Sequence, residues 1–242
     1  MQSVMTRTVT PRAPSGSMTD VFACARAQIY YNSKRKPLTQ VKRETGCSHI
    51  INGYLFNGSF QPVGWTVIDG KVISRDAYQD WGISIGSDGK PQMLTDRGGS
   101  FLSGVPLLKS GAKLERSLTP DVARSAARTA VGWMPDGRIC LWCDKTGLTR
   151  ERLQNKLLGL GVADALMLDG GGSTQGIFPN GKVASSRKVP TMVLFWEETH
   201  QEENTDLNWA GKSGILTEAQ LAEPEKAVTR RELAEILHRL QK

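Results

Sequence analysis

An aspartate followed by three glycines is the part of this sequence best suited to chemistry. Residues 166–174 read LMLDGGGST, so a short apolar run ends at Asp169 and two hydroxyl residues follow the glycines. The pattern predicts a buried strand whose last side chain emerges at a sheet edge. Glycines permit tight turns and close approach of a ligand, and their amides can bind an anion. A carboxylate beside such a loop suits hydrolysis of a sugar phosphate.

Three further segments carry residues that suit the same chemistry. They are residues 52–57 (NGYLFN), 128–132 (RTAVG) and 185–190 (SSRKVP). Singly, each has an ordinary structural interpretation as a turn, a surface arginine or a loop. The glycine loop also lacks the GxGxxG spacing of a dinucleotide site and the lysine of a P-loop. We expect the four segments to converge on one pocket with the acid at its floor.

As a set, these segments resemble the phosphodiester glycosidase (uncovering-enzyme-like) family. The resemblance covers residues 20–196, and its pieces are residues 51–56, 64–73, 128–132, 164–173 and 187–190. It implies hydrolysis of a sugar 1-phosphodiester to a free sugar and a phosphomonoester. Family members often have Asn-Gly-Gly-Phe-Phe, whereas Tyr54 and Leu55 replace the second glycine and the first phenylalanine here. We therefore do not carry over the specificity of better-known members.

The resemblance and the chemistry together assign roles. The Asp169 carboxylate can stabilise or attack the developing oxocarbenium ion, or activate water. Arg128 and Arg187 can bind the phosphate through bidentate contacts. We expect the catalytic residues to be Asp169, Arg128 and Asn52, and the substrate-binding residues to be Gly53, Thr129, Gly170, Gly171, Gly172, Ser173, Thr174 and Arg187. Among these, Asn52, Thr129, Ser173 and Thr174 would orient hydroxyls.

No second carboxylate and no cofactor is indicated. The sequence requires no cofactor, although a divalent cation held by Asp169 remains an alternative. An acid for the leaving oxygen is dispensable because phosphate is already a good leaving group. Cys140 and Cys143 form a lone CxxC in a predicted strand, which favours core cysteines over a zinc or redox site. For His49, a buried structural role is favoured over one in the site.

The many short apolar segments predict an α+β domain at residues 20–196. We expect a mixed, mostly antiparallel sheet with a few packed helices. Asp-Gly pairs at 69–70, 88–89 and 136–137 separate apolar runs, which is typical of hairpins. Residues 21–31 are predicted to form one strand, and residues 38–45 and 149–160 to form helices.

The two ends of the chain differ from this body. Residues 1–19 read as a disordered lead-in without the apolar region of a signal peptide. Residues 197–206 read as an acidic linker. Residues 207–242 predict a small helical appendage that resembles one S-layer homology module, with a packing or dimerising helical pair as the alternative. No apolar run approaches the roughly 20 residues that span a bilayer.

The charge distribution favours an anionic ligand. Residues 1–196 carry 25 Lys and Arg against 14 Asp and Glu, whereas residues 197–242 carry 6 against 10. A basic body raises the local concentration of anionic carbohydrate polymers such as teichoic-acid-like wall glycans. Nucleic acid is disfavoured because no recognised binding motif is present.

Function and location therefore have two interpretations each. The first function is a hydrolase of a sugar phosphodiester, and the alternative is a non-catalytic module that binds phosphorylated glycan or cell wall. A wall substrate would place the chain outside the cell or on a virion, and its absence would favour the cytoplasm. The oligomeric state is not indicated.

Overall fold

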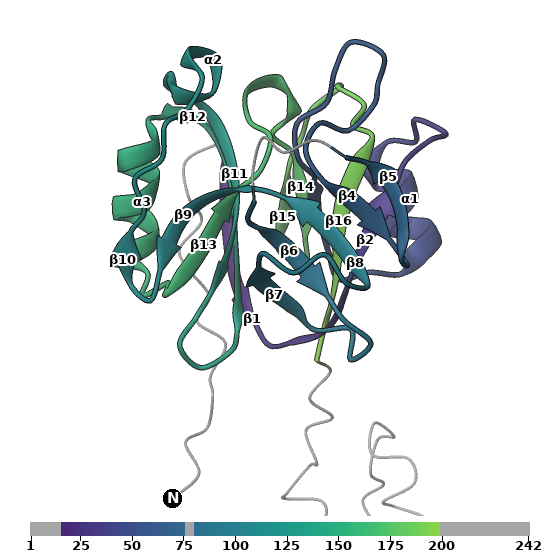
Figure 1. Ribbon diagram of the computed structural model, residues 1–242, viewed down its shortest axis with the longest axis horizontal. Coiled ribbons are helices and arrows are strands. Elements are labelled where there is room, and N and C mark those ends of the chain that lie inside the picture. The colour runs from purple at the N-terminus through teal and green to yellow at the C-terminus, as the bar shows by residue number, and fades with distance from the viewer. Residues whose placement is uncertain (1–15, 76–79, 199–242) are drawn as a thin grey trace, which may run out of the picture. The chain divides into compact units, whose positions relative to one another are not determined.

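The computed structural model describes residues 16–75 and 80–198, which form a β-rich fold of three antiparallel sheets (Figure 1). The chain divides into two compact units, residues 1–198 and 199–242. The predicted linker from residue 199 onward and the helical appendage lie outside the described residues. Within the described part, β16 extends to Glu197, the first residue of the predicted linker.

The largest of the three sheets has six strands. Its order is β1–β12–β11–β13–β9–β10. The strands are β1 (Ser17–Phe22), β12 (Ile139–Leu148), β11 (Ala126–Trp133), β13 (Asp164–Met167), β9 (Val105–Lys109) and β10 (Ala112–Lys113). Helix α3 (Arg150–Gly159) packs against β9 and β12, with Leu153 and Leu157 fully buried. The short helix α2 (Pro120–Ala123) precedes β11.

A five-stranded sheet lies beside it, in the order β15–β14–β3–β16–β2. Its strands are β15 (Gly181–Val183), β14 (Gly176–Phe178), β3 (His49–Asn52), β16 (Thr191–Glu197) and β2 (Cys24–Tyr31). Helix α1 (Leu38–Thr45) packs against β3 and β14, with Leu38 and Val41 as its buried residues. It ends at Gly46, whose φ of 66° favours glycine.

The third sheet has the order β5–β4–β8–β6–β7. Its strands are β5 (Lys71–Ser74), β4 (Thr66–Ile68), β8 (Ser100–Ser103), β6 (Gly82–Ile85) and β7 (Pro91–Leu94). The turn at Asp69–Gly70 joins β4 to β5, as the sequence predicts. The other two predicted Asp-Gly hairpins are also confirmed, since they join β6 to β7 and β11 to β12.

Residues 21–31 do not form the single predicted strand. Strand β1 pairs with β12 in one sheet, and β2 pairs with β16 in another, with Ala23 between them. Strand β1 begins at Ser17, inside the predicted lead-in of residues 1–19. Because the single residue Ala23 separates the two strands, one apolar stretch of sequence contributes strands to two sheets. The apolar pattern alone does not mark this interruption.

A buried polar pair joins β1 to β3. The His49 ring is fully buried, and its Nε2 lies 3.0 Å from Asp20 Oδ2. The ring also stacks on Phe22 with 3.8 Å between centroids. His49 does not line the pocket described below, so the preferred structural role is confirmed. The four cysteines are free and buried, as expected for core residues.

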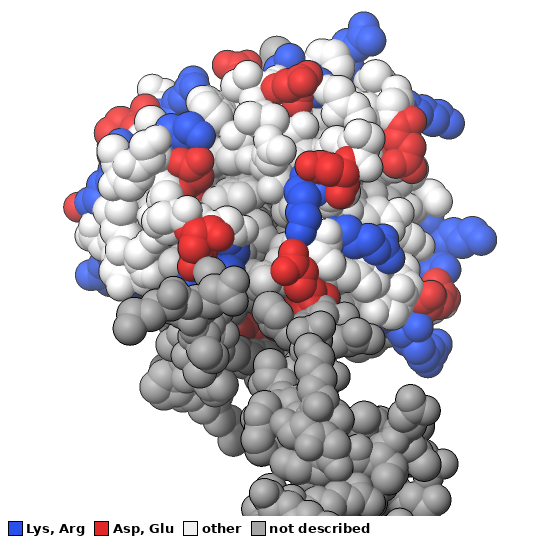
Figure 2. All heavy atoms as spheres, turned by 90° about the horizontal axis from the view of Figure 1, so that it is seen from below, with Lys and Arg blue, Asp and Glu red and all other residues white. Residues whose placement is uncertain are grey.

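Charge is dispersed on the face of the molecule shown in Figure 2. Lysine and arginine alternate there with aspartate and glutamate, and neither sign forms a broad patch. No helix among the described residues is long and apolar enough to cross a membrane.

Candidate active site

Strand β13 delivers Asp169 to the junction between two sheets. Beyond the end of the strand, Leu168 N–H donates to the Thr129 carbonyl oxygen at 2.9 Å. Asp169 N–H then donates to the Gly53 carbonyl oxygen at 3.1 Å. The backbone of Asp169 is therefore attached to β11 of the six-stranded sheet on one side and to the end of β3 on the other.

The Asn52 side chain completes this attachment. Its Nδ2 donates to the carbonyl oxygens of Asp169 at 2.8 Å and Gly53 at 3.0 Å. Its Oδ1 accepts from Thr129 Oγ1 at 2.7 Å and from Gln175 N–H at 3.1 Å. One amide group thus connects β3, β11 and both ends of the glycine loop.

The structure places Asn52 behind the pocket rather than on its wall, and the catalytic role expected for it stays a prediction. Its side chain is fully buried, and it is not among the residues that line the pocket. Thr129, Ser173 and Thr174 are also fully buried and outside the lining. The prediction that they orient hydroxyls of the substrate is not tested by this arrangement. Gly53 packs directly against Thr191, where a Cβ would lie 2.2 Å from Thr191 Oγ1.

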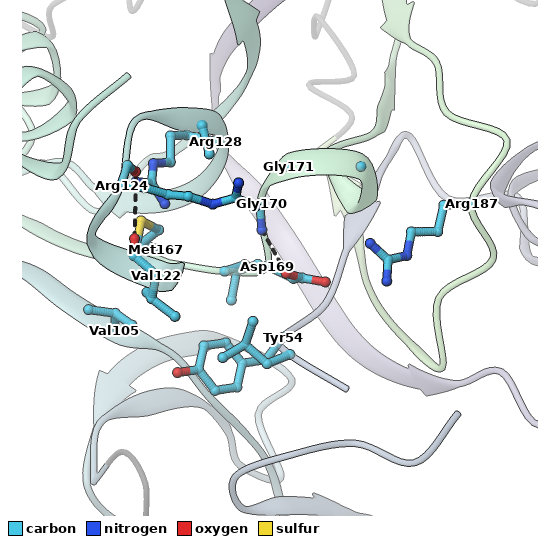
Figure 3. Close-up of a pocket in the computed structure, with 14 residues that line it drawn as sticks. Tyr54, Val105, Val122, Arg124, Arg128, Met167, Asp169, Gly170, Gly171 and Arg187 are labelled. Atoms are coloured by element: carbon cyan, nitrogen blue, oxygen red, sulfur yellow. Dashed lines mark hydrogen bonds between the residues drawn. The ribbon is translucent and has the colours of Figure 1, made fainter. Parts of the chain in front are cut away.

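The remaining predicted residues do share one pocket (Figure 3). It encloses about 150 Å³. The lining residues that the sequence predicted are Arg128, Asp169, Gly170, Gly171, Gly172 and Arg187, and the others are Tyr54, Leu55, Val105, Val122, Arg124, Ala126, Met167 and Leu168. The Asp169 carboxylate points into this space, and Arg187 faces it from the opposite side (Figure 3).

Burial controls the Asp169 carboxyl. Desolvation raises its pKa above the ordinary value, because the charged form loses water. The Ser173 hydroxyl, the Gly170 amide and the Arg187 charge each act in the opposite direction. The ionised form therefore depends on these partners, of which Arg187 alone contributes a full charge.

Arg128 is committed mainly to the protein itself. Its side chain is buried, its Nε donates to the Leu148 carbonyl oxygen at 3.0 Å, and its Nη2 donates to the carbonyl oxygens of Val122 and Arg124. Desolvation and the nearby charge of Arg124 lower its pKa. These hydrogen bonds connect α2 and β12 to β11 beside the pocket. The remaining guanidinium nitrogen, Nη1, lies near Gly170.

Arg187 is available to a ligand. The side chain is exposed, and it makes no ion pair within residues 16–75 and 80–198. Its guanidinium carbon lies 5.0 Å from the centroid of the Phe56 ring. An aromatic face orients a guanidinium without neutralising its charge. Arg187 is therefore the better placed of the two predicted phosphate ligands.

Two backbone amides of the glycine loop are left for a ligand. Gly170 N–H donates to Asp169 Oδ1 at 2.9 Å, and Ser173 N–H donates to the Gly170 carbonyl oxygen at 3.1 Å. The amides of Gly171 and Gly172 have no hydrogen-bond partner in the described part of the chain. Both residues line the pocket, so these two N–H groups can bind an anion.

The donor set favours an anion over a divalent cation. Asp169 is the one acidic residue in the pocket lining, and arginines and backbone amides surround it. Across the residues that the structure describes, no three His, Cys, Asp or Glu side chains gather as a metal site. A hard cation prefers several oxygen ligands, which this lining does not supply.

Tyr54, Leu55 and Arg124 extend the predicted site. Tyr54 and Leu55 lie on the pocket wall, at the two positions where the sequence departs from the family pattern. Arg124 reaches the pocket from the segment after α2, and no sequence motif marks it. The sequence indicated Met167 and Leu168 only as part of the apolar run before Asp169, and not as residues of the pocket wall.

Residues 45–196 match the family model described as phosphodiester glycosidase, more than half of the chain. The chain belongs to this family. The match spans β3, β11, β13, the glycine loop and Arg187, so it includes the whole candidate site. At the level of the family, this membership indicates a glycosidase-type enzyme.

Solved structures share the fold at low sequence identity. The catalytic domain of zebrafish N-acetylglucosamine-1-phosphodiester alpha-N-acetylglucosaminidase, auto-inhibited by its pro-peptide, is 17% identical, with a TM-score of 0.59 over 80% of this chain and 87% of that one. A hypothetical protein from Synechocystis is 14% identical, with a TM-score of 0.59 over 77% and 61%. A putative exported protein from Burkholderia pseudomallei is 11% identical, with a TM-score of 0.51 over 71% of each chain. No curated protein sequence matches the chain.

The first prediction concerns two glycines of the loop. A Cβ at Gly170 would lie 2.5 Å from the Ala127 carbonyl oxygen, whereas a Cβ at Gly172 would make ordinary contacts of 3.5 Å or more with Arg187. Gly170→Ala should lower the free energy of unfolding by about 1–3 kcal/mol, and Gly172→Ala should change it by less than about 0.5 kcal/mol. Urea unfolding of the two variants tests this, and equal losses would contradict the geometry.

The second prediction concerns the Asn52 side chain. Asn52→Leu leaves the Thr129 hydroxyl, the Gln175 amide and the Asp169 carbonyl without their partner, so the free energy of unfolding should fall by about 2–5 kcal/mol. Asn155→Leu, on the exposed side of α3, is the matched control and should stay within about 0.5 kcal/mol of wild type. Equal stabilities of the two variants in urea would show that the Asn52 bonds do not hold the junction.

Proposed function

We propose that this chain hydrolyses a sugar 1-phosphodiester, with Asp169 acting at the anomeric carbon. The observation that carries the proposal is the pairing of one half-buried carboxylate with an exposed, unneutralised Arg187 across a small pocket. Breaking the anomeric C–O bond develops positive charge on the sugar and negative charge on the departing phosphate. The two sides of the pocket match these two charges.

The phosphate belongs on the Arg187 side. The Arg187 guanidinium and the N–H groups of Gly171 and Gly172 supply charge and hydrogen bonds to the departing phosphomonoester. Bond cleavage leaves the shared oxygen on phosphorus, and water supplies the hydroxyl of the free sugar. Since phosphate leaves readily, this step needs no second carboxylic acid.

The sugar belongs on the side formed by Tyr54, Val105 and Met167. These side chains are buried and present an apolar wall with one phenol ring. The space of about 150 Å³ is small beside the roughly 300–1,000 Å³ of pockets for drug-sized ligands, which favours one sugar ring over a longer chain of sugars. Wall polymers of the teichoic-acid type that carry single sugars on phosphate are thus among the substrates to screen.

Asp169→Asn tests the chemistry directly. The substitution keeps the size and an acceptor for the Gly170 amide but removes the charge, so kcat/KM on the best substrate of a sugar 1-phosphodiester screen should fall by about 10²–10⁴-fold. Burial opposes ionisation of Asp169, so loss of the charge should leave the melting temperature at pH 7 unchanged or higher. Asp80→Asn, at an exposed site away from the pocket, is the matched control and should retain full activity.

Two outcomes separate catalysis from binding. If wild type releases no sugar from any diester yet binds one with the same affinity as Asp169→Asn, the non-catalytic glycan-binding alternative replaces this proposal. When sugar is released, NMR of the first anomer identifies the role of Asp169. Retention of configuration indicates attack on the anomeric carbon, and inversion indicates activation of water.

The pH profile tests the coupling between Asp169 and Arg187. Because burial raises the pKa of Asp169, the acid limb of kcat/KM should lie above the ordinary aspartate value of about 3.9. The Arg187 charge lowers this pKa, so Arg187→Gln should move the acid limb to higher pH. An unmoved limb in Arg187→Gln would show that the two groups are not coupled.

A further inference from the structure

A row of four side chains in contact leads away from the pocket, beginning at Arg187. The Arg187 guanidinium carbon lies 5.0 Å from the Phe56 ring centroid, and the Phe56 and Phe60 rings meet edge to face with 5.7 Å between centroids. The Arg35 guanidinium carbon lies 4.5 Å from the Phe60 centroid. We call Arg187, Phe56, Phe60 and Arg35 the Arg–Phe row.

The row is positively charged and has no acid of its own. Residues 31–36, 56–61 and 185–190 contain five lysines and arginines and no aspartate or glutamate. Lys36 is paired with Glu44 of α1. Arg35, like Arg187, makes no ion pair in the described part of the chain. The two stacked guanidinium groups at the ends of the row therefore keep their charge for a ligand.

The backbone is strained where the outer pair forms. Phe60 has φ of 64° and Arg35 has φ of 51°, and both side chains make this conformation unfavourable. Strained positions of this kind concentrate at binding and catalytic sites. The two residues with this backbone conformation are the two that form the outer contact of the row.

We infer that the Arg–Phe row is a subsite for the leaving group of the phosphodiester, and that it selects leaving groups carrying a second negative charge. The inference rests on the proposed function, because it starts from phosphate at Arg187. A diester bound there must extend its alcohol out of the small pocket, and the row begins at that residue. Phe56 and Phe60 orient the two arginines, which reduces the conformational entropy lost when an anion binds.

Two substrates that differ only in the leaving group test this. Both contain the 1-phosphate of the sugar that is released fastest in the screen, one as its methyl ester and the other as its ester with glycerol 3-phosphate. Wild type should show about 10-fold higher kcat/KM for the glycerol phosphate ester at low salt. The preference should disappear in 1 M NaCl, where exposed charges are screened.

Variants then assign the preference to the row. Arg35→Gln should reduce kcat/KM for the glycerol phosphate ester by about 3–10-fold through KM, and leave the methyl ester unchanged. Phe60→Asn, which tolerates the same backbone conformation, should act in the same direction. Arg152→Gln, an equal change of charge on an exposed residue of α3, is the matched control and should preserve the preference.

The outcomes distinguish this inference from the function on which it rests. Equal kcat/KM for the two esters in wild type, or equal loss on both in Arg35→Gln, overturns the subsite while leaving hydrolysis established. Absence of cleavage of every diester overturns the proposed function and the subsite with it. Correct folding of each variant is shown by its urea unfolding curve.

Discussion

The site depends on a single buried amide. Asn52 makes four hydrogen bonds at the place where β3, β11 and the glycine loop meet, and its side chain is fully buried. In such an environment a fully paired polar group fixes geometry strongly, because every alternative leaves a partner unsatisfied. The Asp169 backbone is held by this group, so the position of the carboxylate is set by the fold rather than by the loop itself.

The fixed backbone of Asp169 holds its carboxyl at a partly desolvated position, where the charged form is less favourable than in water. The Asp169 carboxyl is partly desolvated, which raises its pKa, and its charge is supported by a few donors and by Arg187 across an open gap. The negative charge of a substrate phosphate would interact with Arg187. The positive charge that develops on the sugar would interact with the Asp169 carboxylate. Preorganised charges of this kind need little rearrangement during the reaction.

Some of the residues predicted for the site line one pocket, and others are buried behind it. Asp169, Gly170–Gly172 and Arg187 were predictable because a strand-acid-glycine run and an arginine in a loop have direct chemical meaning. The burial of Asn52 and Thr129 behind the pocket was not predictable, because it depends on a contact between residues 77 positions apart. No local sequence pattern indicates that Arg124 lines the pocket. None indicates that residues 21–31 are divided between two sheets. The same holds for the Arg–Phe row, which exists only through tertiary packing.

The thiols of the four cysteines are unreactive in the folded protein. All are buried, and desolvation raises the pKa of Cys24, Cys140 and Cys143 to about 12, so little thiolate forms in the native state. Gly172, by contrast, has room for a side chain directed toward Arg187. A cysteine introduced there would be the one reactive thiol of the folded protein, and a fluorophore or spin label on it would report ligand arrival beside the carboxylate in real time.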